Sequence, residues 1–212
     1  LHVSVSLALR DTLLPALTHL AAELREKSER FAELVKIGRT HLMDATPLTL
    51  GQEFSGYAAQ VRKGAERAER AIACLAELAI GGTAVGTGIN THPAFGARVA
   101  SLLCEETGLP FREADNHFEA QGGRDDAVEV AGILAAISAG LTKVANDIRL
   151  LGSGPRSGLG EIALPATQPG SSIMPGKVNP VMSEMLVQAC LFVQGQCQTV
   201  VSAGRDGHFE LN

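Results

Sequence analysis

Two stretches of the sequence bring together residue types that bind anions and transfer protons. The first is a Gly- and Pro-rich segment at 170–180, which contains Ser171, Ser172, Lys177 and Asn179. Glycines let backbone amides approach a ligand closely, and hydroxyl, ammonium and amide groups hydrogen-bond to anions. The segment ends a long loop and leads into an apolar run that is compatible with a helix, so we expect a functional loop carried by a rigid element. Taken alone, it predicts a carboxylate or phosphate site.

The spacing within this loop indicates how an anion would be held. Lys177 and Asn179 lie two residues apart, and alternate residues of an extended chain point to the same side, where both could grip one carboxylate. Glu184 follows in the first turn of the expected helix and would point back toward the loop. A solvated lysine and an ordinary helix-start glutamate explain the same residues equally well, since anionic side chains favour helix starts for structural reasons.

The second stretch is residues 37–47, where Thr40 and His41 are followed by Asp44. Imidazole titrates near neutral pH, so a loop histidine beside a hydroxyl suits proton transfer or anion binding. A surface histidine without a chemical role is the alternative. Because Gly38 and Pro47 interrupt the helical pattern, we expect an exposed connecting loop here.

Other classes of site find no support in the sequence. The Gly-rich runs at 81–88 and 158–160 lack the preceding strand and the GK[ST] ending of a nucleotide-binding loop. HExxH and ligand-spaced clusters of His and Cys are missing, so we expect no metal and no cofactor. The net charge of -5, without a basic block, disfavours nucleic acid and anionic membranes as partners. The four cysteines form no CxxC pair and lie in apolar segments, which predicts buried, reduced thiols.

Composition and periodicity predict an all-α protein built as a long-helix bundle. The chain has 212 residues and is 45% hydrophobic but only 4% aromatic, as in helical bundles. No β-alternation is found. The segment 125–151 is apolar almost all round, so we expect it to be buried on all sides, which a single bundle of this size rarely achieves without oligomerisation. Apolar spacing predicts helices at 1–35 with a kink or restart at Pro15, and at 50–78, 93–107, 125–151 and 180–203.

Longer motifs resemble a known enzyme superfamily. Residues 170–179 read GSSIMPGKVN, which resembles the GSSxMPxKxN signature of the fumarase and aspartase superfamily. Residues 38–47 resemble its second characteristic region, and the similarity continues through 81–88, 145–149 and 153–156. His41 and Thr46 stand where aspartases usually have Gln and Val, so within the superfamily the chain resembles class II fumarate hydratases.

This resemblance implies a reaction and a set of roles. The reaction is the reversible trans hydration of fumarate to L-malate, a step of the tricarboxylic acid cycle, without metal or cofactor. Ser171 corresponds to the base that removes a proton from carbon, and His41, held by Glu184, corresponds to the acid/base or water-activating residue. The residues implied in substrate binding are Thr40, Ser172, Lys177, Val178 and Asn179.

The resemblance also implies a wider assembly. The chain starts at Leu1 inside a helical pattern without an initiator Met and stops at Asn212 as a new segment begins. We therefore expect residues 1–212 to be the central helical domain of a longer protein, which forms a homotetramer with active sites shared between subunits. The implied compartment is the cytoplasm, or the mitochondrion in a eukaryote. Two alternatives remain at this stage: an aspartate ammonia-lyase, and a helical oligomerisation scaffold without activity, since the isolated piece is expected to be inactive.

Overall fold

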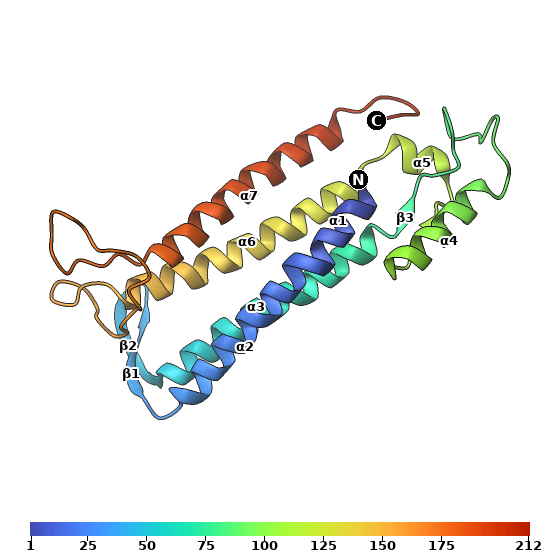
Figure 1. The fold of residues 1–212 in the computed structure, drawn as a ribbon. Coiled ribbons are helices and arrows are strands. Elements are labelled where there is room, and N and C mark those ends of the chain that lie inside the picture. The colour runs from blue at the N-terminus through green and yellow to red at the C-terminus, as the bar shows by residue number, and fades with distance from the viewer.

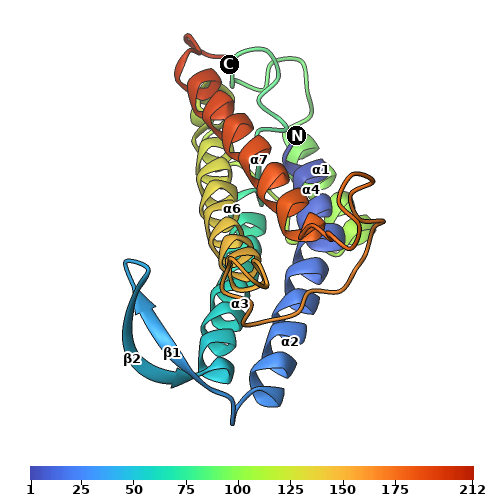
Figure 2. The ribbon, with the colours of Figure 1, turned by 90° about the vertical axis from the view of Figure 1, so that its left-hand side faces the viewer.

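Four long helical rods run side by side and form the body of the molecule (Figure 1, Figure 2). The computed structural model describes all 212 residues. The N-terminal rod packs along α3 (Leu50–Cys74), α3 along α6 (Asp125–Leu151), and α6 along α7 (Val181–Arg205). The prediction of an all-α, long-helix bundle is confirmed.

The N-terminal rod is a broken helix made of three parts. They are α1 (His2–Ala8), the π-helical turn η1 (Leu9–Leu13) and α2 (Leu14–Arg30). Pro15 lies in the first turn of α2, where a missing backbone N–H costs little, and the widened turn comes directly before it. The break therefore occurs at the proline, as the sequence indicates.

The remaining helices lie close to their expected positions. Helix α4 (Phe95–Thr107) ends at Gly108, which has a φ of 72° and so closes the helix in the left-handed conformation. A short helix, α5 (His117–Gly122), follows. Helix α3 ends earlier than expected, and β3 (Glu77–Leu78) then pairs in parallel with β4 (Arg112–Glu113).

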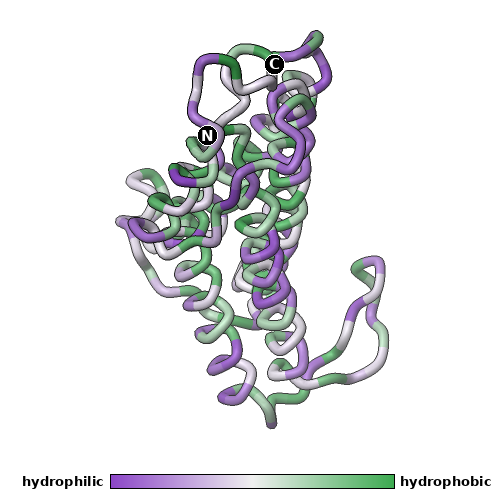
Figure 3. Tube along the Cα trace, turned by 90° about the vertical axis from the view of Figure 1, so that its right-hand side faces the viewer, coloured by the Kyte–Doolittle hydropathy of each residue, from purple (hydrophilic) through white to green (hydrophobic).

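A β-hairpin stands where the sequence predicted a connecting loop. Strand β1 (Val35–Thr40) pairs antiparallel with β2 (Met43–Thr49), so the expectation of no β structure was wrong for this segment. Its two-residue turn has no Asn-Gly or Asp-Gly, the usual signal for such a turn. The hairpin projects away from the helices, along which hydrophobic residues recur (Figure 2, Figure 3).

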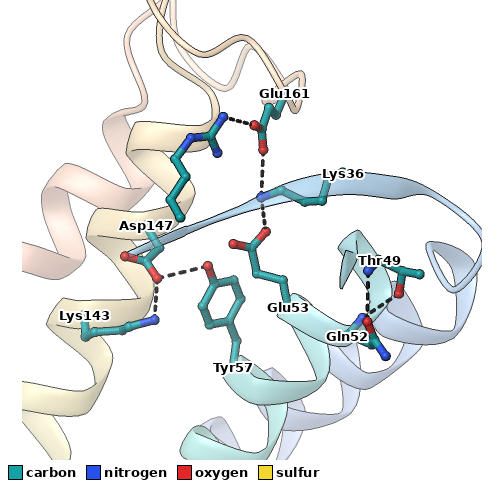
Figure 4. Close-up of polar contacts among 9 residues, drawn as sticks. Lys36, Thr49, Gln52, Glu53, Tyr57, Lys143, Asp147 and Glu161 are labelled. Carbon is teal, nitrogen blue, oxygen red and sulfur yellow. Dashed lines mark hydrogen bonds and ion pairs between the residues drawn. The ribbon is translucent and has the colours of Figure 1, made fainter. Parts of the chain in front are cut away.

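The hairpin is joined directly to the bundle at its base. Thr49 ends β2 and also caps α3: its Oγ1 accepts a hydrogen bond from the Gln52 backbone N–H at 3.1 Å. The Gln52 side chain returns the bond by accepting from the Thr49 N–H at 2.9 Å (Figure 4). This reciprocal pair satisfies two backbone N–H groups at the point where the hairpin joins the helix.

The main core lies between α2, α3 and α6. Phe54 at its centre meets Phe31 and Tyr57 edge to face, with ring centroids 5.4 and 5.5 Å apart, which is the favoured geometry for aromatic pairs. The buried members of this core are Leu17, Leu24, Leu50, Phe54, Tyr57, Val61, Ala68, Ile137 and Val144.

Helix α6 is not buried on all sides within this single chain, and the expectation that it is buried on all sides in an oligomer stays a prediction. One face packs on α3 and another on α7, but a row of small residues, Gly132, Ala136 and Ala139, remains exposed. By length and composition α6 could also cross a bilayer. Its position between two packed helices is that of a core helix. Sequence periodicity could not reveal the open row, because the row depends on which neighbours are present.

The four cysteines are free thiols in the structure. Cys190 and Cys197 are buried, and burial raises the pKa of each thiol, so neither has the character of a reactive thiolate. Cys74 and Cys104 are only half-buried, which corrects the expectation that all four would be buried.

Candidate active site

Thr40 and His41 lie at the exposed tip of the hairpin. Thr40 pairs with Met43, so His41 and Leu42 form the turn. Both turn residues are left-handed, with φ of 53° and 65°. This conformation costs a residue other than glycine about 1–2 kcal/mol, and such strain concentrates at functional sites. The turn thus presents the imidazole to solvent at a conformational cost.

Charged side chains hold the stem of this hairpin. Lys36 Nζ lies 2.6 Å from Glu53 Oε2 on α3 and 2.7 Å from Glu161 Oε2, in the loop that follows α6 (Figure 4). Arg39 donates a hydrogen bond to the other carboxylate oxygen of Glu161. Burial alone would raise the pKa of the Glu161 carboxyl, but the hydrogen bond from Arg39 and the ion pair with Lys36 outweigh it and hold that pKa below its usual value. Glu161 is therefore an anion that two cations share.

Ser171 sits in a loop that its own backbone closes. The Ser171 N–H donates to the Lys177 carbonyl at 3.0 Å, and the Lys177 N–H donates to the Met174 carbonyl at 3.1 Å. The loop passes so close to itself that a Cβ on Gly170 would lie 2.6 Å from the Lys177 oxygen. A glycine is therefore required at that position.

The hydroxyl of Ser171 receives two backbone hydrogen bonds. The N–H groups of Ile173 and Met174 each donate to Ser171 Oγ at 3.3 Å. Donors aimed at an oxygen favour its negatively charged form, so this arrangement makes the hydroxyl more acidic. The loop thus aims two backbone donors at one half-buried serine oxygen.

The other candidate residues follow on the same loop or just after it. Ser172, Lys177, Val178 and Asn179 are all exposed, and Glu184 lies half-buried in the first turn of α7. The loop from Gly170 to Pro180 therefore gathers most of the candidates within one segment, as the sequence suggested.

The structure does not bring the two candidate segments together within one chain. The hairpin and the segment that leads into α7 lie on opposite sides of this end of the bundle (Figure 2). No hydrogen bond or ion pair joins His41 to Glu184 or to Ser171 in the chain. The pairing of His41 with Glu184 stays a prediction.

A well-formed cavity lies elsewhere. It has a volume of about 580 Å³ and is found at the opposite end of the bundle, near α5 and the chain start, where it is lined in part by His2, Phe95, Gln121 and Arg124. It contains no candidate catalytic or substrate-binding residue. This cavity is therefore separate from the candidate site, whose Thr40, Ser172, Lys177 and Asn179 are exposed.

Sequence reasoning missed the charged residues that hold the hairpin. Arg39 and Glu161 are 122 positions apart, and neither belongs to a pattern that indicates the other. The only signal within the chain was the position of Arg39 immediately before Thr40.

Comparisons with known proteins agree with the fold and with the motifs. A protein-family model described as lyase matches residues 1–195. Over all 212 residues the chain is 56% identical to a class II fumarate hydratase of Methylorubrum extorquens and 52% identical to a mitochondrial fumarate hydratase of Saccharomyces cerevisiae, and it covers 45% and 43% of these relatives.

The architecture is shared with a solved enzyme. The crystal structure of a recombinant class II fumarase from Schistosoma mansoni superimposes with a TM-score of 0.96 at 37% identity, covering 99% of this chain and 47% of that one. The chain thus spans about half the length of the curated relatives it matches.

Proposed function

This chain belongs to the lyase family whose model it matches, and from that premise we propose that the full-length protein is a fumarate hydratase, which interconverts fumarate and L-malate. The observation that carries the proposal is the Ser171 hydroxyl, which receives two backbone N–H groups in a loop that also presents Lys177 and Asn179. The names of the relatives, which are about half identical to this chain, support fumarate and malate as the substrates.

The difficult step is removal of a proton from a carbon next to a carboxylate. In the malate-to-fumarate direction, the ionised Ser171 oxygen takes that proton, and the C–H electrons move into the adjacent carboxylate. The resulting aci-carboxylate carries two negative charges, which Lys177 and Asn179 stabilise by donating hydrogen bonds. The double bond then forms as the hydroxyl group on the neighbouring carbon leaves, and His41 protonates it to water. Hydration follows the reverse path.

The remaining residues bind substrate or hold the catalytic groups. Thr40 and Ser172 contact the substrate carboxylates, together with Val178 of the loop, and Glu184 orients the His41 imidazole. No cofactor is needed for these steps, because the charge that develops is met by an ammonium group, an amide and backbone donors.

We further infer that the active site is shared between subunits of a homotetramer. Two features support this inference. The hairpin and the Ser171 loop lie on opposite sides of the bundle end (Figure 2), and α7 leaves large apolar side chains exposed, among them Leu191 at 58% and Phe192 at 68%. Apolar surface of this kind typically becomes covered by a partner.

The cellular compartment and the domain organisation of the full-length protein are also proposed from the similarity to these relatives. Residues 1–212 act as the central helical-bundle domain, and the full enzyme works in the cytoplasm, or in the mitochondrion if the source is a eukaryote, where a relative is named mitochondrial. The 212-residue piece alone is proposed to be inactive.

The central test is the Ser171→Ala variant of the full-length protein. Fumarate absorbance follows turnover in both directions, and we expect turnover to fall by several orders of magnitude while circular dichroism and oligomeric state stay unchanged. Ser55→Ala, at an exposed position on α3, is the matched control and should retain full activity. Near wild-type turnover in Ser171→Ala would remove the role given to this residue.

Two further measurements separate the alternatives. Ammonia released from aspartate faster than malate is formed from fumarate would identify an aspartate ammonia-lyase. The purified 212-residue piece, free of longer protein, should show no hydration even if it associates, and measurable hydration by it would contradict its proposed inactivity.

A further inference from the structure

We propose that Glu161 is a positioning residue for the reaction, whose carboxylate holds the hairpin so that His41 is presented in one fixed place. The proposal rests on the fumarate hydratase function inferred above. Glu161 itself lies outside both candidate segments, nine residues before Gly170. Its role would be exerted through Arg39 and Lys36 and not through contact with the substrate.

The hairpin has few other attachments. At its base it is joined to the bundle by the Thr49 cap, and the Leu50 N–H donates to the Leu34 carbonyl at 2.8 Å. Between Lys36 and the turn, the bond from Arg39 to Glu161 is the only hydrogen bond or ion pair that ties the hairpin to the rest of the chain. Without it, the tip would be connected to the bundle only through the two strands.

Glu161 is itself firmly held. Its backbone N–H donates to the Leu151 carbonyl at the end of α6, at 2.9 Å, and the neighbouring Ile162 packs against the main core. The side chain is only 20% exposed. The carboxylate is therefore a fixed point to which the hairpin is attached.

The strands are shaped so that two cations reach this one carboxylate. Residues three apart on a regular strand point to opposite faces, yet Lys36 and Arg39 both bind Glu161. Between Ile37 and Arg39 the pairing register shifts by one residue, with the extra residue on β2, and such a bulge increases the local twist of the strand pair.

The ion pairs that attach the hairpin to Glu161 belong to a partly buried cluster of charges. Lys36 is 11% exposed and bridges Glu53 and Glu161 (Figure 4), so two anions and two cations form one partly desolvated cluster. Charge-assisted bonds at such a place are stronger and more directional than those between exposed ions. Neutralising Glu161 would remove the only ion pair of Arg39 and would leave Lys36 paired with Glu53 alone.

Loss of the contact with Glu161 would affect catalysis because Arg39 is close in sequence to Thr40 and His41. Arg39 is two residues before His41 and directly before Thr40, so movement of Arg39 moves both candidate residues. A misplacement of about 1 Å at a reacting group can lower a rate about 100-fold. We therefore expect loss of Glu161 to reduce kcat by displacing His41, and to raise KM as well by displacing Thr40.

The test compares Glu161→Gln with Glu66→Gln in the full-length protein. Glu66 pairs with Arg62 on the exposed surface of α3 and serves as the matched control. We expect Glu161→Gln to lower kcat about 10- to 100-fold and to increase amide hydrogen exchange across residues 35–49, while α3 and α6 keep their protection. Glu161→Asp, which keeps the charge, should recover part of the lost kcat.

The experiment distinguishes failure of the positioning role of Glu161 from failure of the proposed fumarate hydratase function. If the wild-type protein hydrates no fumarate, the function fails, but hydrogen exchange still reports whether Glu161 holds the hairpin. Unchanged exchange at 35–49 in Glu161→Gln would overturn the positioning role whatever happens to kcat. A loss of protection throughout α3 and α6 would also overturn it, because Glu161 would then serve the stability of the whole bundle.

Discussion

The phenol of Tyr57 donates a hydrogen bond to the carboxylate of Asp147, with 3.0 Å between Oη and Oδ2, and so joins α3 to α6 next to the hairpin (Figure 4). Burial, and then the nearby Glu53 and Asp147 carboxylates, raise the pKa of Tyr57, so the phenol remains a donor at all physiological pH values. Lys143 also pairs with Asp147 and lies 4.8 Å from the centre of the Tyr57 ring. The core and the Lys143–Asp147 ion pair therefore meet at this one residue.

Removing this hydroxyl should cost little compared with removing the ring. Tyr57→Phe loses one hydrogen bond, and Asp147 keeps Lys143 as a partner, so we expect the free energy of unfolding to fall by about 1 kcal/mol. Tyr57→Ala also removes the packing against Phe54 and should cost about 3–5 kcal/mol. Urea unfolding of the full-length protein measures both. Equal losses in the two variants would show that the aromatic contact contributes nothing.

Gly38 is predicted to tolerate no side chain. A Cβ at this position would lie 2.7 Å from the Thr46 carbonyl oxygen, so Gly38→Ala must push the two strands apart where the pairing register shifts. We expect at least a 10-fold loss of turnover in the full-length enzyme, because the displaced strand carries His41. Gly56→Ala on α3, with no atom within 4 Å of the added carbon, is the control and should keep full turnover.

The left-handed turn should gain stability from a residue suited to that conformation. Leu42 has a φ of 65° and is 74% exposed, and Asn adopts this conformation more readily than Leu. Leu42→Asn is expected to stabilise the hairpin by about 1 kcal/mol, seen as slower hydrogen exchange at residues 35–49. Leu42→Ala keeps the strain and should bring no such slowing. Faster exchange in Leu42→Asn would mean that the leucine side chain makes a stabilising contact that outweighs the strain.

The ion pairs of Glu161 predict how stability depends on pH. Its pKa is lower in the folded protein than the ordinary value of 4.5, so the folded state holds the carboxylate in its ionised form. The resulting stabilisation is fully present above the unfolded-state pKa and is lost as pH falls through the folded-state pKa. Urea unfolding should show wild type more stable than Glu161→Gln near neutral pH, with the difference shrinking in acid below about pH 4.5. A difference that grows in acid would contradict this assignment.

Some features of this protein follow from residues that are close together in the chain. The bounds of α6 were predicted from periodicity alone, and the Ser171 loop was recognised because its glycines, hydroxyls, lysine and asparagine all fall within residues 170–179. Helical spacing and short motifs are local properties, so a sequence displays them directly.

Other features depend on partners that the sequence does not place side by side. The hairpin was missed because His41 and Leu42 turn the chain without glycine, and a strained turn persists only when its surroundings hold it. Glu161 was missed because the ion pair with Arg39 spans 122 positions. The open face of α6 likewise depends on where α3 and α7 pack. Local periodicity and motif chemistry determine the helices and the serine loop, whereas only packing in three dimensions brings distant charges together and decides where the histidine is held.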